Sequence, residues 1–103
     1  MRVLIAPDSF TGTLTAAQAA RAVADGWGRQ APGDELDLCP LSDGGPGFVD
    51  VLAAALPGRV ELVTVPGPLG EPVPAQVLLV QGPDGDLMAY VESAQACGLH
   101  LVP

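Results

Sequence analysis

Residues 2–41 read RVLIAPDSFTGTLTAAQAARAVADGWGRQAPGDELDLCPL, and this stretch decides the fold. It opens with a short apolar run, residues 2–6, that is rich in β-forming side chains. The run stops at Pro7 and Asp8, which indicates a buried strand that leads into a loop.

An amphipathic helix is predicted next, from Thr13 or Thr15 to Gln30. Apolar side chains recur there near one face, and Trp27 among them is expected to pack in the core. Either threonine could serve as the N-cap. Pro32 and Gly33 end the helix, and residues 35–41 alternate as a second strand. The order strand, helix, strand predicts a βαβ unit with parallel strands and a right-handed crossover.

The second half of the chain is richer in strand signals. Residues 43–47, DGGPG, lead into a second predicted helix over residues 48–56, with Pro46 suited to its first turn. Turn sequences then separate β-branched and apolar runs, and residues 93–99 resemble the first turns of a helix. The predicted strands are residues 59–65, 73–80 and 87–92. The fold class expected is therefore α/β, with a βαβ start followed by a β-rich segment.

The charge balance excludes some classes of partner. Four arginines, no lysine and twelve acidic residues give a formal net charge of −8. Nucleic acids and anionic membranes are bound by basic patches, so neither is an expected partner.

The chain has no sequence signal for export or membrane insertion. Pro7 and Asp8 come too early for a signal-peptide core, and there is no run of about eighteen apolar residues. The protein is therefore expected in the cytoplasm. Cys39 and Cys97 are accordingly expected to be reduced, buried thiols.

Two carboxylates follow the two predicted parallel strands. Asp8 comes after the first strand and Asp43 after the second. Because ligands bind beyond the carboxyl ends of strands in an open parallel sheet, we expect both side chains at one ligand-binding edge. Such a pair could hold Mg²⁺ through water, orient a substrate hydroxyl or accept its proton during phosphoryl transfer. The alternative is that both are N-cap or turn residues.

Glycines and hydroxyls lie beside these carboxylates in the sequence. Gly12, Gly44 and Gly45 would let backbone N–H groups approach an anion, or would only supply positive φ angles. Ser9 and Thr11 could donate hydrogen bonds to a phosphate or a carboxylate, with capping as the alternative.

One further acidic candidate lies near the end of the chain. Glu92 follows the last predicted strand and precedes a predicted helix, where it could be functional or could only cap the helix. Neither a GxxxxGK[ST] loop nor a GxGxxG after a strand is present, so the two commonest nucleotide-binding fingerprints are absent from this chain.

Four motifs, in order, resemble the N-terminal segment of the bacterial glycerate kinases of the type 1, glycerate 2-kinase-like group. Residues 3–16, VLIAPDSFTGTLTA, are similar to their opening IAPDSFKGSLSA. Residues 41–47, LSDGGPG, resemble ADGGEGT. Residues 67–73, GPLGEPV, resemble a GPLGEPV turn, and residues 92–99, ESAQACGL, resemble an EMA…GL segment.

The resemblance implies a fold and a domain boundary. Members of that family resemble one another in a Rossmann-like domain into which a second α/β domain is inserted, with the active site in the cleft. Residues 1–66 would be the N-terminal part of the Rossmann-like domain, and residues 67–103 the start of the second. The chain would be an N-terminal portion that is inactive alone. Its protein partners would be the remaining C-terminal part and, through exposed strand edges, copies of itself.

The resemblance also implies an activity. It is the transfer of the γ-phosphoryl group of ATP, with Mg²⁺, to a hydroxyl of glycerate. Asp8 and Asp43 would be catalytic, one of them orienting or deprotonating the hydroxyl and the other helping to hold the metal. The substrate- or phosphate-binding residues would be Ser9, Thr11, Gly12, Gly44, Gly45 and Glu92.

Two departures from the family pattern leave other functions open. Thr11 stands where the family commonly has lysine, and Pro46 where it commonly has glutamate, which predicts altered substrate contacts or reduced activity. One alternative is a non-catalytic relative that binds a small organic acid. The other is a general βαβ domain that binds a different phosphorylated metabolite.

Overall fold

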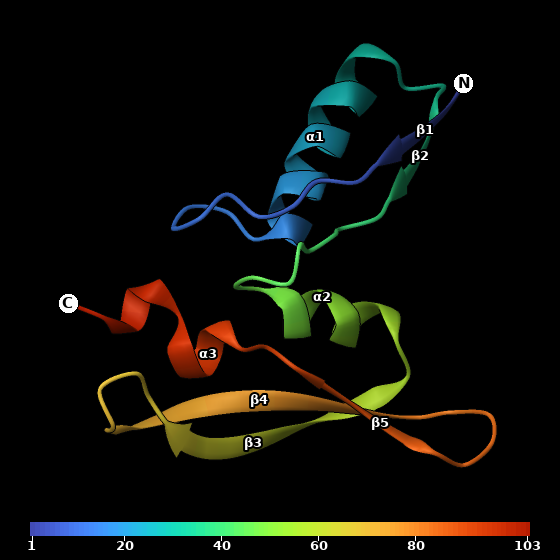
Figure 1. The fold of residues 1–103 in the computed structure, drawn as a ribbon. Coiled ribbons are helices and arrows are strands. Elements are labelled where there is room, and N and C mark those ends of the chain that lie inside the picture. The colour runs from blue at the N-terminus through green and yellow to red at the C-terminus, as the bar shows by residue number, and fades with distance from the viewer. The chain divides into compact units, whose positions relative to one another are not determined.

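The computed structural model describes residues 1–103 and divides them into two compact units, Met1–Asp43 and Gly44–Pro103 (Figure 1). The first unit holds β1 (Arg2–Ile5), α1 (Ala16–Gln30) and β2 (Glu35–Leu38). β1 and β2 pair in parallel, with Arg2 opposite Glu35 and Ile5 opposite Leu38. The predicted βαβ unit is confirmed.

Strand β2 is shorter than residues 35–41. It ends at Leu38, before Pro40, which has no N–H to give to a regular ladder. Pairing nevertheless continues beyond the strands through two isolated backbone hydrogen bonds. Cys39 N–H donates to the Ile5 carbonyl at 2.7 Å, and Leu41 N–H donates to the Pro7 carbonyl at 3.0 Å.

Helix α1 begins with a capping box built on Thr15. The backbone N–H of Gln18 donates to the Thr15 hydroxyl at 3.1 Å, and the Thr15 N–H donates to the Gln18 side-chain oxygen at 2.9 Å. These two bonds satisfy N–H groups that a helix start leaves without partners. Of the two predicted caps, Thr15 is therefore correct, since the Thr13 hydroxyl donates to the Phe10 carbonyl instead.

Small residues carry the packing of α1 against its two strands. Ala16, Ala19 and Ala20 are buried, as is Ile5 of β1. Trp27, expected in the core, keeps 39% of its surface exposed. Two strands are too narrow to cover a full helix face, and the indole Nε1–H donates to Asp34 beside α1 at 3.0 Å.

The second unit begins with α2 (Phe48–Ala55). Gly47 is its N-cap, so Pro46 lies in the turn before the helix, and the prediction that it lies in the first turn is wrong. An antiparallel sheet follows, in the order β3 (Gly58–Pro66), β4 (Pro72–Gln81), β5 (Leu87–Val91). The predicted β-rich segment is confirmed. The helix expected over residues 93–99 is only α3 (Ala94–Cys97), followed by a single 3₁₀ turn, Leu99–Leu101.

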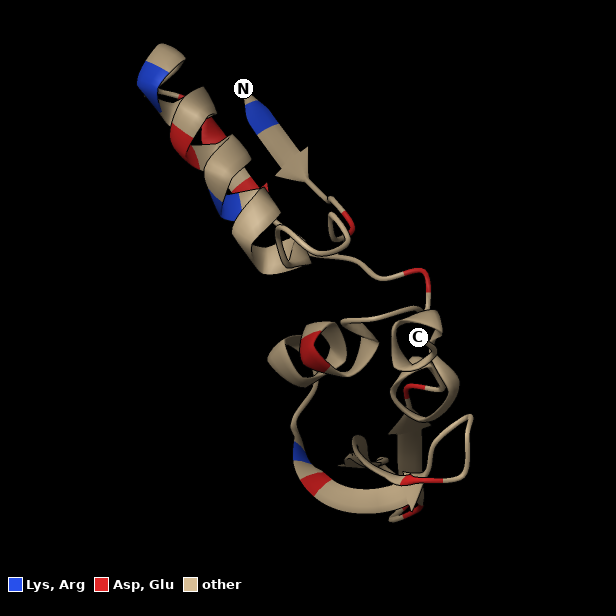
Figure 2. Ribbon diagram, turned by 90° about the vertical axis from the view of Figure 1, so that its left-hand side faces the viewer, with Lys and Arg blue, Asp and Glu red and all other residues tan.

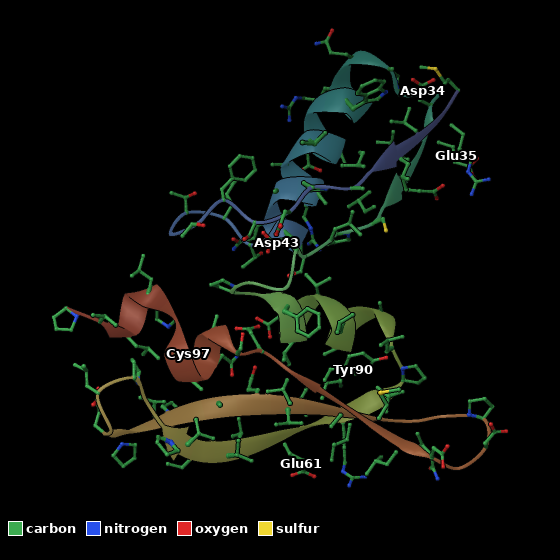
Figure 3. All side chains as sticks on the ribbon, in the orientation of Figure 1. Asp34, Glu35, Asp43, Glu61, Tyr90 and Cys97 are labelled. Carbon is green, nitrogen blue, oxygen red and sulfur yellow. The ribbon has the colours of Figure 1, made fainter.

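Helices α2 and α3 both contact β4 and lie on one face of the antiparallel sheet (Figure 1). Val49 of α2 and Leu78 of β4 are fully buried and form the centre of this packing. The rings of Phe48 and Tyr90 lie tilted, with centroids 6.5 Å apart, and Tyr90 is labelled in Figure 3.

The boundary predicted after residue 66 falls between β3 and β4, which pair along their whole length. The two compact units of this chain divide between Asp43 and Gly44. How the units distribute between the domains of the family fold stays a prediction.

Both cysteines are free, as expected, but Cys39 and Cys97 are exposed and not buried. Cys39 directly follows the end of β2, and Cys97 ends a one-turn helix, so neither lies inside an element that packs on both sides. No helix combines the length and the apolar character that crossing a bilayer requires.

The capping box gives a first prediction, for the product of the longest reading frame that contains this chain, called the parent protein below. Thr15→Ala removes the hydroxyl acceptor and should lower the free energy of unfolding by about 1 kcal/mol, measured by urea denaturation. Thr15→Ser keeps an acceptor and is the matched control. Equal stability of the two variants would contradict the assignment of the cap.

A second prediction concerns Asp34. The Trp27 indole and, next, the Met1 amino group at 3.0 Å donate to its carboxylate and hold its pKa below the ordinary value of 3.8. A carboxyl with a lowered folded-state pKa adds stability above pH 3.8, and that stability is lost as the pH falls through the folded-state pKa.

Asp34→Asn should therefore lower the melting temperature near pH 7, and the difference from wild type should shrink in acid. Melting curves across the acidic range test this, with the exposed Asp25→Asn on α1 as control. A difference that grows in acid would overturn the assignment.

Candidate active site

The parallel ladder between β1 and β2 continues into the loops that carry the predicted acidic residues. After the Cys39 and Leu41 bonds described above, the next donor along the same side of the chain is Asp43 N–H. It donates to Oδ2 of the Asp8 side chain at 3.2 Å. The two loops therefore run side by side from the strand ends to Asp43.

The Asp8 carboxylate accepts a second backbone hydrogen bond. Its Oδ1 accepts from the N–H of Ser9 at 2.6 Å. One oxygen thus holds its own loop and the other holds the loop after β2. Asp8 and Asp43 lie at the same sheet edge, as the topology predicts. Asp8 also bonds the backbone of its own loop, as expected of a turn residue, which was the alternative interpretation. Figure 3 labels Asp43 at the end of its loop.

Thr11 and Gly12 form the tip of a tight turn between β1 and α1. Phe10 and Leu14 bridge its base, with the Phe10 N–H 2.9 Å from the Leu14 carbonyl. Gly12 has φ +80°, and a Cβ there would meet no atom within 4 Å. Conformation, and not crowding, therefore requires glycine. Ser9, Thr11 and Gly12 share the loop of Asp8, and Thr11 is exposed.

Gly44 and Gly45 begin the second unit and lead into α2. Gly44 has φ +102°, again with open space around its missing Cβ. The Gly45 carbonyl accepts from the N–H of Phe48, the first residue of α2, at 3.1 Å. Both glycines thus shape the turn that joins Asp43 to the helix.

Glu92 caps a helix, but not the one that follows it. It is 5% exposed, and its Oε1 accepts from the buried N–H of Val49 at 3.0 Å. Gly47 at the N-cap of α2 offers no side-chain acceptor, so Glu92 supplies one from 43 residues away. The carboxylate fixes the start of α2 against the end of β5.

Sequence reasoning missed one polar contact in the same unit. Gln95 Oε1 accepts from the N–H of Gln76 at 2.6 Å and ties α3 to β4. A lone glutamine on a one-turn helix gives no sequence signal for this contact.

Acidic residues outnumber basic ones throughout the chain, which has a formal net charge of −8. Red acidic segments occur in both units of Figure 2, whereas blue basic ones are few. The four arginines lie at positions 2, 21, 29 and 59, outside the loops that carry Asp8 and Asp43. Within this chain, charge on a bound phosphate would be balanced by backbone N–H groups or by a bound cation; cationic side chains from outside these residues are a further source.

The donor chemistry of this edge suits Mg²⁺. That ion prefers oxygen ligands and is commonly held by one or two carboxylates, with waters and substrate phosphates completing its shell. Asp8 has used two of its roughly four acceptor positions on backbone N–H groups. No cluster of three or more acidic, histidine or cysteine side chains forms a closed cage.

A βαβ unit with two parallel strands that end in acidic loops defines an α/β protein. In open sheets of this class, small ligands bind beyond the carboxyl ends of the strands. The sequence profile of the glycerate kinase family matches residues 3–103. The chain belongs to the glycerate kinase family.

Relatives and a solved structure agree with this assignment. The chain is 47% identical over 102 residues to a glycerate kinase of Halalkalibacterium halodurans and 39% identical over 104 residues to the glycerate 2-kinase of Escherichia coli. The matches cover 98% and 100% of this chain, respectively. The chain therefore spans only 26% of the length of each relative. The crystal structure of a putative glycerate kinase 2 from Salmonella typhimurium superposes with a TM-score of 0.74 and 39% identity, over 100% of this chain and 27% of the other.

A third prediction follows from Glu92. Glu92→Ala leaves the buried Val49 N–H without an acceptor and should cost about 1–3 kcal/mol of unfolding free energy, measured by urea denaturation of the parent protein. Glu92→Gln retains a side-chain carbonyl and should lose less. An alanine variant as stable as the glutamine variant would show that the hydrogen bond to Val49 contributes nothing measurable.

Proposed function

We propose that this chain is the N-terminal part of a glycerate kinase, which transfers the γ-phosphoryl group of ATP to a hydroxyl of glycerate. The observation that carries the proposal is the match of the glycerate kinase family over residues 3–103. The pairing of the Asp8 and Asp43 loops at one sheet edge supports it, because phosphoryl transfer needs groups that position the hydroxyl and balance charge.

The edge that carries Asp8 and Asp43 is proposed to serve two tasks, with Asp43 as the residue that contacts the reacting groups. One task is to orient the attacking hydroxyl or accept its proton, and the other is to help hold Mg²⁺ through a carboxylate oxygen. When bound, the ion would neutralise charge on the phosphate oxygens. Catalysis would come mainly from positioning and electrostatics.

The neighbouring loop residues are proposed to receive substrate or phosphate. Ser9, Thr11 and Gly12 share the loop of Asp8, and Gly44 and Gly45 follow Asp43 directly. Their backbone N–H groups, with the hydroxyls of Ser9 and Thr11, are suitable donors to anionic oxygens. Glu92 is better explained by its hydrogen bond to α2, so we propose a supporting and not a contacting role for it.

A fourth prediction tests the function. The parent protein should phosphorylate D-glycerate with ATP and Mg²⁺, and EDTA should stop turnover. Asp43→Asn should lower kcat by about 10²- to 10⁴-fold, the range contributed by a positioned acid or base. Coupled ADP release measures the rate, and NMR of the product identifies the phosphorylated hydroxyl.

The exposed Asp25→Asn on α1 is the matched control and should turn over like wild type. Undiminished turnover by Asp43→Asn would exclude Asp43 from the reaction. If the parent protein binds glycerate or another small organic acid but never turns over ATP, the non-catalytic alternative is correct.

A further inference from the structure

The hydrogen bonds at the edge of the parallel sheet follow a regular spacing that ends on a side chain. The N–H groups of residues 39 and 41 donate to the carbonyls of residues 5 and 7. By the same two-residue step, Asp43 N–H would meet the carbonyl of Ser9. The acceptor is instead Oδ2 of Asp8, at 3.2 Å. A carboxylate therefore replaces the last backbone acceptor of the ladder.

We propose that Asp8 is a positioning residue, which acts in phosphoryl transfer by fixing the backbone of Asp43 and not by its own contact with substrate. The role of Asp43 in the reaction is taken from the proposed function. The role of Asp8 is inferred from its two observed hydrogen bonds, to the N–H groups of Ser9 and Asp43.

A carboxylate suits this task better than an amide of the same shape. Its two oxygens only accept, so each can take one of the two backbone N–H groups, from Ser9 and from Asp43. An asparagine would offer one oxygen and one NH₂ group, and the NH₂ group would face an N–H donor. Charge-assisted hydrogen bonds are also shorter and stronger than neutral ones.

The position of the bond explains why it matters. Asp43 directly precedes Gly44, which has φ +102° and marks the start of a different compact unit. The Asp8 bond therefore holds the backbone at the end of this unit. It lies two residues beyond Leu41, whose N–H makes the preceding bond of the ladder.

A double-mutant cycle tests this assignment in the parent protein. Asp8→Asn should lower kcat about 100-fold, with a smaller change in KM for glycerate, because a misplacement of about 1 Å at a reacting group costs on that order. In an Asp43→Asn background the same change should add no more than about twofold, since Asp8 then has nothing left to position. Additive losses would overturn the proposal, because they would give Asp8 its own contact with the reaction.

Hydrogen exchange tests the same bond without any assay of activity. In Asp8→Asn the amides of Ser9 and Asp43 should exchange about tenfold faster or more, the effect of losing a hydrogen bond to a charged group. Asp8→Glu, which keeps two acceptor oxygens, should restore part of the protection and separates loss of the bond from loss of folding. The exposed Asp25→Asn should leave both amides unchanged.

The two arms separate failure of the inference from failure of the proposed function. Unchanged exchange in Asp8→Asn overturns the inference whatever the activity. Faster exchange in a protein that does not phosphorylate glycerate supports the positioning of Asp43 and overturns the proposed function.

Discussion

Parallel pairing of β1 with β2 is the constraint on which the acidic edge depends. Two strands that run the same way must end at the same edge, so the loops after Ile5 and Leu38 start as neighbours. Pro7 and Pro40 each lack an N–H, yet the ladder persists through alternate residues up to Leu41. The Asp8 carboxylate adds one more hydrogen bond, which fixes the backbone of Asp43 to the loop after β1.

A second carboxylate performs a related task in the other unit. Glu92 supplies the acceptor that Gly47 does not offer at the start of α2, and its burial makes that bond costly to lose. Asp8 and Glu92 thus both act on the backbone of a segment more than thirty residues away in sequence. Asp8 bonds the residue just before the glycine-rich turn, residues 44–47, and Glu92 bonds the start of the helix just after it. Within that turn Gly44 and Gly47 have positive φ angles.

Much of this organisation could be predicted from the sequence because it depends on local signals. The strand and helix order, the Thr15 cap and the shared edge of Asp8 and Asp43 follow from periodicity, capping chemistry and topology. The partners of Asp8 and Glu92 could not be predicted, because both depend on tertiary register. The exposure of Trp27 was missed for a similar reason, since periodicity shows which side chains share a face but not how much of that face is covered.

The most direct test of the account is a crystal structure of the parent protein with Mg²⁺, D-glycerate and a non-hydrolysable ATP analogue. A carboxylate oxygen of Asp43 should lie at hydrogen-bond distance, roughly 2.6–3.2 Å, from a glycerate hydroxyl or from a water on the metal. Asp8 should still accept the Asp43 N–H. Glycerate and triphosphate bound away from both loops, or a direct contact of Asp8 with the substrate in place of that bond, would contradict it.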